Sequence, residues 1–361
     1  MGDEANRTFT EENGGGKLPA MYVSNPKNVR YLCGFTGEDS SLILTGDAVL
    51  FITDSRYVEQ AREELSDLIQ IVCWNRSLLD ETAEIIRKHH IQEIGFEGSY
   101  LSYSHGELFK SLAQIKTRIT DGCVEAFRAV KDEDEICKTL EAVKIVDRTF
   151  MHILNFIRPG ISEKQVATEM EYFMKCIGSE GTPFETLVVS GIRSAYPHGV
   201  ASEKMIELGD MVILDFGATF QGYSSDMTRT IAVGKPDSRL SEIYDLVLEA
   251  ELAGVDAICH GMKSKELDSM IRSPFVRENM NDRFNHGAGH SIGLDNHEAP
   301  YISYRSEDEF VENMIMTVEP GLYLPGLGGV RIEDDVLVRK EKSLVLTGSP
   351  KKDLIQLPFY E

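Results

Sequence analysis

Two aspartates, Asp215 and Asp226, stand eleven residues apart in the stretch Gly209–Thr230, GDMVILDFGATFQGYSSDMTRT. This stretch is typical of a β-hairpin with the strands Met211–Leu214 and Tyr223–Thr230. If the loop is centred on Phe220 and Gln221, the two aspartates face each other with Cβ atoms roughly 4.5–5.5 Å apart. Facing carboxylates repel, so a folded sheet keeps them together only if a positive charge, such as a metal ion, lies between them.

A second pair of acids has the same relation. Glu319 and Glu333 are symmetric about Gly326, so a hairpin with an odd-numbered loop places them opposite each other. The predicted strands and the Pro- and Gly-rich loop between them are Met314–Glu319, Val330–Val338 and Pro320–Gly329. Among 59 acidic residues some face each other by chance, but Asp215 directly follows an apolar run, where a buried acid usually has a partner.

The segment between the hairpins, Asn285–Pro300, holds three of the nine histidines in HGAGHSIGLDNHEAP. Four carboxylates and at least one histidine match two divalent cations, with His290 as a neutral ligand. Two ions about 3.5–4 Å apart create hydroxide at neutral pH and stabilise a tetrahedral oxyanion, so hydrolysis is the predicted reaction class. We interpret five other histidines as structural: His89, His90, His105, His152 and His260.

The elements that must position these residues belong to a domain that begins near residue 125. A long helix with apolar residues at i, i+3/i+4 spacing starts at Ile136 and is expected to continue through Ile157, up to Pro159. Ser162 and Gln165 form a capping box that opens a second amphipathic helix. The next predicted elements are a strand over Leu187–Ser190, a loop with Tyr196–Gly199, and helices over about Ser241–His260 and from Ser264.

The preceding part of the chain alternates short strands with helices, as in an α/β domain with a mixed sheet. The predicted strands are Ala20–Val23, Ser41–Leu44, Ala48–Thr53, Leu68–Cys73 and Ile94–Phe96. The predicted helices are Tyr57–Leu65, Leu79–His89 and His105–Ile115. Residues 1–17 are polar with a run of three glycines, so we expect a flexible N-terminal arm outside the fold.

Composition narrows the class of protein further. The length of 361 residues allows two domains, and the net charge of −22 disfavours nucleic acid and anionic membrane surfaces as partners. The six cysteines form no C-x-x-C pair, which favours reduced thiols over a zinc knuckle or a disulfide scaffold. No stretch approaches the roughly 18 apolar residues of a membrane span, and no signal pattern is present, so we expect a cytoplasmic location.

Several separated motifs also occur in a fixed order: NVRYLCGFTG, TDSRY, LDFGATFQGYSSDMTRT, HGAGHSIGLDNHEAP, TVEPGLY and VRIEDD. The last four resemble the aminopeptidase P, prolidase and methionine aminopeptidase superfamily of pita-bread metallopeptidases. The first two resemble the N-terminal domain of its prolidase and aminopeptidase P branch. The resemblance implies a creatinase/prolidase-type α/β domain with a mixed sheet over residues 18–125, an α+β pita-bread catalytic domain over residues 126–361, and a homodimer.

The resemblance implies five ligands for two metal ions: Asp215 for one ion, Asp226 and Glu333 as bridges, and His290 and Glu319 for the other. This set agrees with the count of acids made above. Glu319 is by analogy also the expected proton carrier. Because carboxylates favour hard ions, Mn²⁺ is the expected cofactor, with Co²⁺, Fe²⁺ or Zn²⁺ as alternatives.

Three more residues have implied roles in handling the substrate. His198 and His297 match two histidines of the family that do not bind metal but line the substrate pocket, where imidazole suits proton transfer near neutral pH. Arg331 matches an arginine beside the last bridging glutamate. It is expected either to bind a substrate carboxylate or the tetrahedral intermediate, or to form a structural salt bridge to one of the ligands.

The implied activity is hydrolysis of the peptide bond before proline in Xaa-Pro dipeptides, and the alternative is an Xaa-Pro aminopeptidase acting on longer peptides. A creatinase-like C–N hydrolase of small metabolites and a metal-free binding protein are disfavoured, because those branches have lost ligands that are all present here. Two departures stand out. Ser291 occupies a position where prolidases commonly have glycine, in a GHSIG string that also resembles methionine aminopeptidases. The helix that usually precedes the first strand has no counterpart in residues 1–17.

Overall fold

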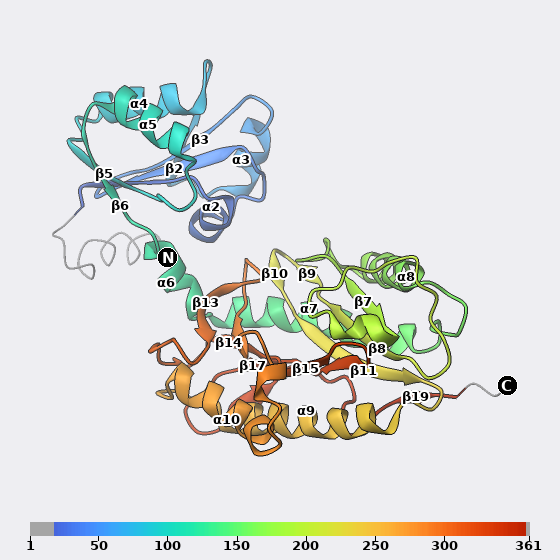
Figure 1. Ribbon diagram of the computed structural model, residues 1–361. Coiled ribbons are helices and arrows are strands. Elements are labelled where there is room, and N and C mark those ends of the chain that lie inside the picture. The colour runs from blue at the N-terminus through green and yellow to red at the C-terminus, as the bar shows by residue number, and fades with distance from the viewer. Residues whose placement is uncertain (1–17, 359–361) are drawn as a thin grey trace. The chain divides into compact units, whose positions relative to one another are not determined.

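The computed structural model describes residues 18–358, and the chain divides into two compact units, Met1–Arg128 and Ala129–Glu361 (Figure 1). The expected arm over residues 1–17 lies outside the described residues. Among the residues that are described, no helix is both long and apolar enough to cross a lipid bilayer.

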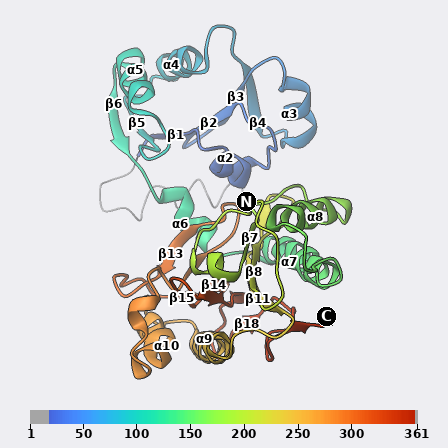
Figure 2. The same cartoon turned by 45° about the vertical axis from the view of Figure 1, so that its right-hand side comes forward.

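The first unit is built on a six-stranded mixed sheet with the order β4-β3-β2-β1-β5-β6 (Figure 2). Its strands are β1 (Ala20–Val23), β2 (Ser40–Thr45), β3 (Val49–Thr53), β4 (Ile69–Cys73), β5 (Glu93–Phe96) and β6 (Lys116–Ile119). Its helices are α2 (Pro26–Cys33), α3 (Val58–Glu64), α4 (Leu78–Lys88), α5 (Tyr103–Ala113) and α6 (Cys123–Ala129). The predicted mixed sheet is confirmed, as are the predicted strands and helices to within a few residues at their ends.

Side chains alternate along β1 and so contribute to two hydrophobic cores, one on each face of the sheet. Tyr22 packs in the core that includes Phe109 of α5, whereas Val23 packs in the core that includes Val29 of α2. The sequence analysis missed three elements, α2, β6 and α6. The helices α2 and α6 span only eight and seven residues, too short for a clear helical period, and β6 has the polar sequence KTRI.

The second unit contains a four-stranded sheet β19-β11-β8-β7, a five-stranded sheet β13-β12-β14-β17-β18 and two small hairpins, β9-β10 and β15-β16. The strands are β7 (Leu187–Ser190), β8 (Met211–Phe216), β9 (Thr219–Phe220), β10 (Tyr223–Ser224), β11 (Met227–Val233), β12 (Gly289–Ser291), β13 (Glu298–Ile302), β14 (Ile315–Val318), β15 (Gly321–Leu324), β16 (Gly328–Arg331), β17 (Asp334–Leu337), β18 (Leu344–Val345) and β19 (Gln356–Leu357). The helices are α7 (Glu133–Ile153), α8 (Glu163–Cys176), α9 (Ser238–Ala257), α10 (Ser264–Arg277) and the 3₁₀ helices η1 (Gly191–Ala195) and η2 (Asn281–Arg283).

Two pairs of helices cover these sheets, as Figure 1 shows. Helices α7 and α8 share a hydrophobic core with β8 and β11, and α9 and α10 share another with β14 and β17. The capping box of Ser162 and Gln165 is confirmed at the start of α8. Helix α7 ends at Ile153, four residues before the predicted Ile157, which is nevertheless buried in the same core because the turn after the helix packs there.

Candidate metal centre

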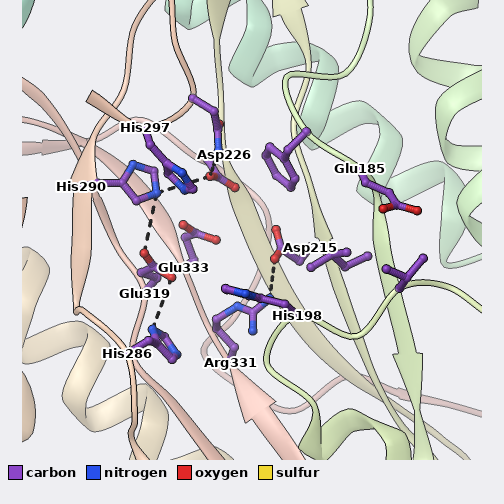
Figure 3. A pocket seen from close by; sticks show the side chains of 14 residues that line it. Glu185, His198, Asp215, Asp226, His286, His290, His297, Glu319, Arg331 and Glu333 are labelled. Carbon is purple, nitrogen blue, oxygen red and sulfur yellow. Dashed lines mark hydrogen bonds and ion pairs between the residues drawn. The ribbon is translucent and has the colours of Figure 1, made fainter. Parts of the chain in front are cut away.

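Fourteen residues of the second unit line one pocket (Figure 3). They include every residue that the sequence analysis assigned to the site: His198, Asp215, Asp226, His290, His297, Glu319, Arg331 and Glu333. The other lining residues are Phe184, Glu185, Leu187, Val200, His286 and Asn296. The five histidines interpreted as structural are not among them.

The predicted register of the first hairpin is wrong by two residues. Asp215 on β8 lies opposite Thr228 on β11, and Asp226 immediately precedes that strand. The turn falls on Gln221 and Gly222, whose φ angles of 47° and 86° are both left-handed, and β9 and β10 pair around it. Because the shift is an even number of residues, Asp215 and Asp226 keep the same side of the hairpin and both reach the pocket.

The predicted register of the second hairpin is confirmed. The last pair of the β14–β17 ladder is Val318 with Asp334, so Glu319 and Glu333 take the next opposed positions. The predicted loop between them is wrong, because β15 and β16 continue the same pairing through Gly321 and Arg331. Only three residues are left for the turn around Gly326, as its prolines and glycines allow.

A β-bulge aims His290 at the acids. The β12–β13 register shifts between His290 and Ser291, and the ring nitrogen Nδ1 of His290 lies 3.1 Å from the backbone oxygen of Ser291. Its other nitrogen, Nε2, lies 3.8 Å from Asp226 and 3.7 Å from Glu319. Burial and the neighbouring His297 lower the pKa of His290 to about 3, so the ring is neutral and Nε2 offers a lone pair to the pocket.

The buried acids carry more negative charge than the folded chain compensates. Asp226, His290 and Glu333 offer ligand atoms that all lie within 4.8 Å of one another. Burial and the neighbouring carboxylates raise the pKa of Asp226 and of Glu319, and they raise the pKa of Glu333 to about 8. Atom Oδ1 of Asp226 is buried with no hydrogen-bond partner. Several carboxylates, one neutral imidazole and an unpartnered oxygen together fit a divalent cation.

Asp215 lies on the side of Glu333 that faces away from His290, and it is paired with Arg331 (Figure 3). The guanidinium of Arg331 also donates to Tyr323 Oη at 2.8 Å and to Thr228 Oγ1 at 3.1 Å. Thr228 in turn donates to Glu333 at 2.7 Å. Arg331 therefore makes the salt bridge to an expected ligand that was one of its two predicted roles.

The two histidines expected to handle the substrate, His198 and His297, are both exposed to solvent on the pocket wall. Partial burial and the nearby His198 lower the pKa of His297, which keeps its ring neutral near neutral pH. A neutral imidazole can both accept and donate a proton.

Known protein families match both units of the chain. Residues 138–340 match Metallopeptidase family M24, and residues 7–130 match the Creatinase/Prolidase N-terminal domain. The chain belongs to metallopeptidase family M24. It combines the N-terminal domain of creatinase and prolidase with the pita-bread catalytic domain, as the motifs implied.

Members of this M24 family resemble the chain along almost its whole length. A Xaa-Pro dipeptidase of Pyrococcus furiosus is 39% identical over 95% of this chain and 97% of its own. The solved structure of a Xaa-Pro dipeptidase from Bacillus anthracis has 44% identity and a TM-score of 0.94, covering 98% of each chain. An X-Pro aminopeptidase structure from Thermotoga maritima has 35% identity and a TM-score of 0.89, covering 98% of this chain and 100% of its own.

The M24 pocket also contains residues to which the sequence analysis gave no role. His286 lies with Nδ1 3.8 Å from Glu319 and Nε2 2.9 Å from Tyr323 Oη, and burial together with Arg331 lowers its pKa to about 3. His286 belongs to the HGAGH string, which could have indicated a role in the site. Its contact with Tyr323 could not have been found in this way, because Tyr323 is 37 residues away in the chain. Thr228, which is buried and does not itself line the pocket, has no signal in the sequence beyond its even spacing from Asp226.

Proposed function

We propose that this protein is a Xaa-Pro dipeptidase that uses divalent metal ions. The observation that carries the proposal is the gathering of Asp226, His290 and Glu333, with Glu319 beside them, in a chain that is 39% identical to a Xaa-Pro dipeptidase over 95% of its length. A peptide with proline at its second position is then the substrate.

Five residues would hold two metal ions in this proposal: Asp215, Asp226, His290, Glu319 and Glu333. When bound, the ions supply Lewis acidity toward the scissile carbonyl and an activated water. Asp215 would then exchange its contact with Arg331 for a metal ion. The nitrogen Nη2 of Arg331 would then be available to bind a carboxylate or the negative charge of a tetrahedral intermediate, while the rest of the guanidinium stays bonded to Tyr323, Thr228 and the backbone oxygen of Pro197.

The side chains around the ions handle the substrate and its protons. His198 and His297 hold the peptide and accept or donate protons, and Glu319 carries a proton to the proline nitrogen as that nitrogen leaves. Glu319 suits this role because its carboxylate lines the pocket between two imidazoles, 3.7 Å from His290 Nε2 and 3.8 Å from His286 Nδ1.

The alternative is an Xaa-Pro aminopeptidase that acts on longer peptides, and the likeness to the X-Pro aminopeptidase of Thermotoga maritima favours it. A dipeptidase must recognise the free carboxylate directly after proline, whereas an aminopeptidase must leave room for the next residue. The two functions therefore differ in one assay. We expect Mn²⁺-loaded protein to cleave Ala-Pro much faster than Ala-Pro-Ala, and a faster tripeptide reaction would assign the aminopeptidase activity instead.

The proposal also covers the identity of the metal ion, the cellular compartment and the oligomeric state. Mn²⁺ is the proposed ion because the ligand set is rich in hard carboxylates, and Co²⁺, Fe²⁺ and Zn²⁺ are to be compared with it. The cytoplasm is the proposed compartment because the six cysteines, all of which lie in the described part of the chain, form no disulfide. A homodimer is proposed from the family resemblance alone. Protein that takes up none of the four ions, or that binds them without cleaving Xaa-Pro, would contradict the proposed function.

A further inference from the structure

One buried lysine lies behind the wall of the pocket that carries the histidines. The side chain of Lys131 is only 1% exposed, and its ammonium group has three acceptors at 3.2 Å: the backbone oxygen of Ala129, Ser291 Oγ and Glu298 Oε2. An ammonium group has three N–H donors, so this geometry can use all of them. Lys131 does not line the pocket itself.

Ser291 connects this lysine to His290. Its hydroxyl accepts from Lys131, and its backbone oxygen lies 3.1 Å from His290 Nδ1. The bulge that turns His290 toward the acids lies at the peptide between these two residues. A hydrogen bond to Nδ1 decides which ring nitrogen carries the proton and therefore which one is free for a metal ion.

Glu298 connects the same lysine to His297. It follows His297 in the chain, pairs with Ser291 across the β12–β13 ladder, and accepts from the backbone N–H of Asp295 at 3.1 Å. The loop enclosed by Ser291 and Glu298 also holds Asn296, which donates to Asp226 at 3.3 Å. The ring centroids of His290 and His297 lie 4.1 Å apart, so a displaced loop would move both rings.

We propose that Lys131 is a positioning residue that holds His290 and His297 in place, through the Ser291 hydroxyl and the Glu298 carboxylate respectively. This gives a role to Ser291, the residue that departs from the glycine common in prolidases. The inference rests on the proposed function, because the orientation of His290 matters most when a metal ion binds to this residue. Removing a residue that orients a metal ligand typically weakens metal affinity about 10- to 100-fold.

The test compares Lys131→Met with the double variant Lys131→Met/Glu298→Gln. The single change withdraws the ammonium from a buried carboxylate, so we expect a lower melting temperature of the metal-free protein and about 10- to 100-fold weaker binding of Co²⁺ in calorimetry. The double change removes both charges. We expect it to recover the melting temperature but to keep the weak Co²⁺ binding, because Ser291 is still not held.

A matched control exists in the same unit. The ammonium group of Lys204 contacts the same three kinds of acceptor, the backbone oxygen of Met205, Ser190 Oγ and Asp210 Oδ2, and none of these residues lines the pocket. We expect Lys204→Met to lower the melting temperature and to leave Co²⁺ affinity unchanged. If Co²⁺ affinity returns together with stability in the Lys131→Met/Glu298→Gln variant, Lys131 is merely structural and the inference is wrong.

A second readout needs no metal. In metal-free protein the Nδ1–H signal of His290 should be sharp in nitrogen-15 spectra and should broaden or shift in Lys131→Met but not in Lys204→Met. Wild-type protein that binds no Co²⁺ would contradict the proposed function, and these spectra would still decide the positioning role. An unchanged His290 signal in Lys131→Met would overturn it.

Discussion

Glu333 and Asp334 are neighbours in the chain, both are buried, and their environments are opposite. Burial and nearby acids raise the pKa of Glu333 to about 8. Burial alone would also raise the pKa of Asp334, but the charges of Arg229 and Lys351 outweigh it and lower that pKa. The two side chains belong to two clusters of charge: the acid cluster in the pocket, with Asp226, Glu319 and Glu333, and the charged network of Asp334, Arg229, Lys351 and Glu251.

The charged network contains its own cations. The side chain of Arg229 is 1% exposed, and its guanidinium contacts Asp334 at 2.6 Å and donates to the backbone oxygen of Glu333, also at 2.6 Å. Lys351 pairs with both Asp334 and Glu251. Arg229 therefore ties down the backbone of the residue whose side chain reaches into the pocket. The chain thus supplies cations to the charged network around Asp334, whereas the acid cluster in the pocket is left with an excess of carboxylates. We infer that the acid cluster is suited to binding cations from solution.

The largest effect should come from Glu333→Ala, which removes an expected bridging ligand. Loss of several kcal/mol of transition-state stabilisation corresponds to a fall in kcat/KM of roughly a thousandfold or more. The measurement is Ala-Pro hydrolysis with excess Mn²⁺, accompanied by the metal content of the protein. Above pH 8, where Glu333 is ionised, the same change should not destabilise the metal-free protein, because it relieves repulsion among the acids. Wild-type turnover in this variant would show that the pocket is not the active site.

The opposite result is expected for Asp334→Asn. Removing this charge leaves Arg229 and Lys351 buried with less compensation, and breaking a buried pair typically costs about 3–5 kcal/mol. Urea unfolding in EDTA measures this loss in the free energy of unfolding, with Glu333→Gln as the matched neutralisation one residue away. Equal destabilisation by the two changes would remove the contrast between the clusters.

The stability of the metal-free protein should depend on pH because of the same excess of acids in the pocket. Glu333 has a folded pKa of about 8 against 4.5 for an ordinary glutamate, so between these values the folded state binds more proton than the unfolded state. Its contribution to stability is therefore complete below pH 4.5 and is lost as the pH rises through 8, and Asp226 and Glu319 act in the same direction. In saturating Mn²⁺ the ion takes the place of the protons, so this loss should disappear.

Melting temperatures in EDTA and in Mn²⁺, measured between about pH 5 and pH 8.5, check this expectation. Glu333→Gln should flatten the curve in EDTA, since it removes the group whose pKa is raised to about 8 and keeps the shape of the side chain. A metal-free protein that becomes more stable with rising pH over this range would contradict the charge imbalance in the pocket.

The two acidic hairpins show what could be predicted from the sequence. The symmetry of Glu319 and Glu333 about Gly326 predicted the correct register, because the prolines and glycines of that segment allow one tight turn at its centre. The register around Asp215 and Asp226 was wrong by two, because Gln221 and not Phe220 adopts the left-handed backbone beside Gly222. Glutamine gives little sign of that conformation, and only the even shift kept both aspartates on the pocket side.

All eight residues assigned to the site line one pocket, because their signals are local: short motifs and residues at the ends of strands. The contacts that could not be predicted join segments that are distant in the chain. Lys131 lies 160 residues from Ser291, and Arg229 lies 105 residues from Asp334. Such contacts follow from packing, and neither lysine nor arginine carries a periodic pattern that points to a distant partner.

The smallest effect that we predict comes from removing the hydrogen bond between the Thr228 hydroxyl and the Glu333 carboxylate. Thr228 Oγ1 donates to Glu333 at 2.7 Å and accepts from Arg331 Nε at 3.1 Å, so it connects the acid cluster to the arginine that pairs with Asp215. Thr228→Val keeps the shape and removes the hydroxyl, and a lost hydrogen bond to a charged group is worth about 1.5–3 kcal/mol. We therefore expect kcat/KM for Ala-Pro to fall about 10- to 100-fold, with Mn²⁺ still bound.

Thr230→Val is the matched control, because Thr230 lies on the same strand but its hydroxyl bonds only to the backbone of Arg331. It should lower stability without a comparable loss of kcat/KM. If both variants lose activity equally, the Thr228 hydroxyl contributes to folding alone. If Thr228→Val loses as much activity as Glu333→Ala, the orientation of Glu333 and not only its charge determines the metal centre, since valine leaves the carboxylate in place while removing its anchor.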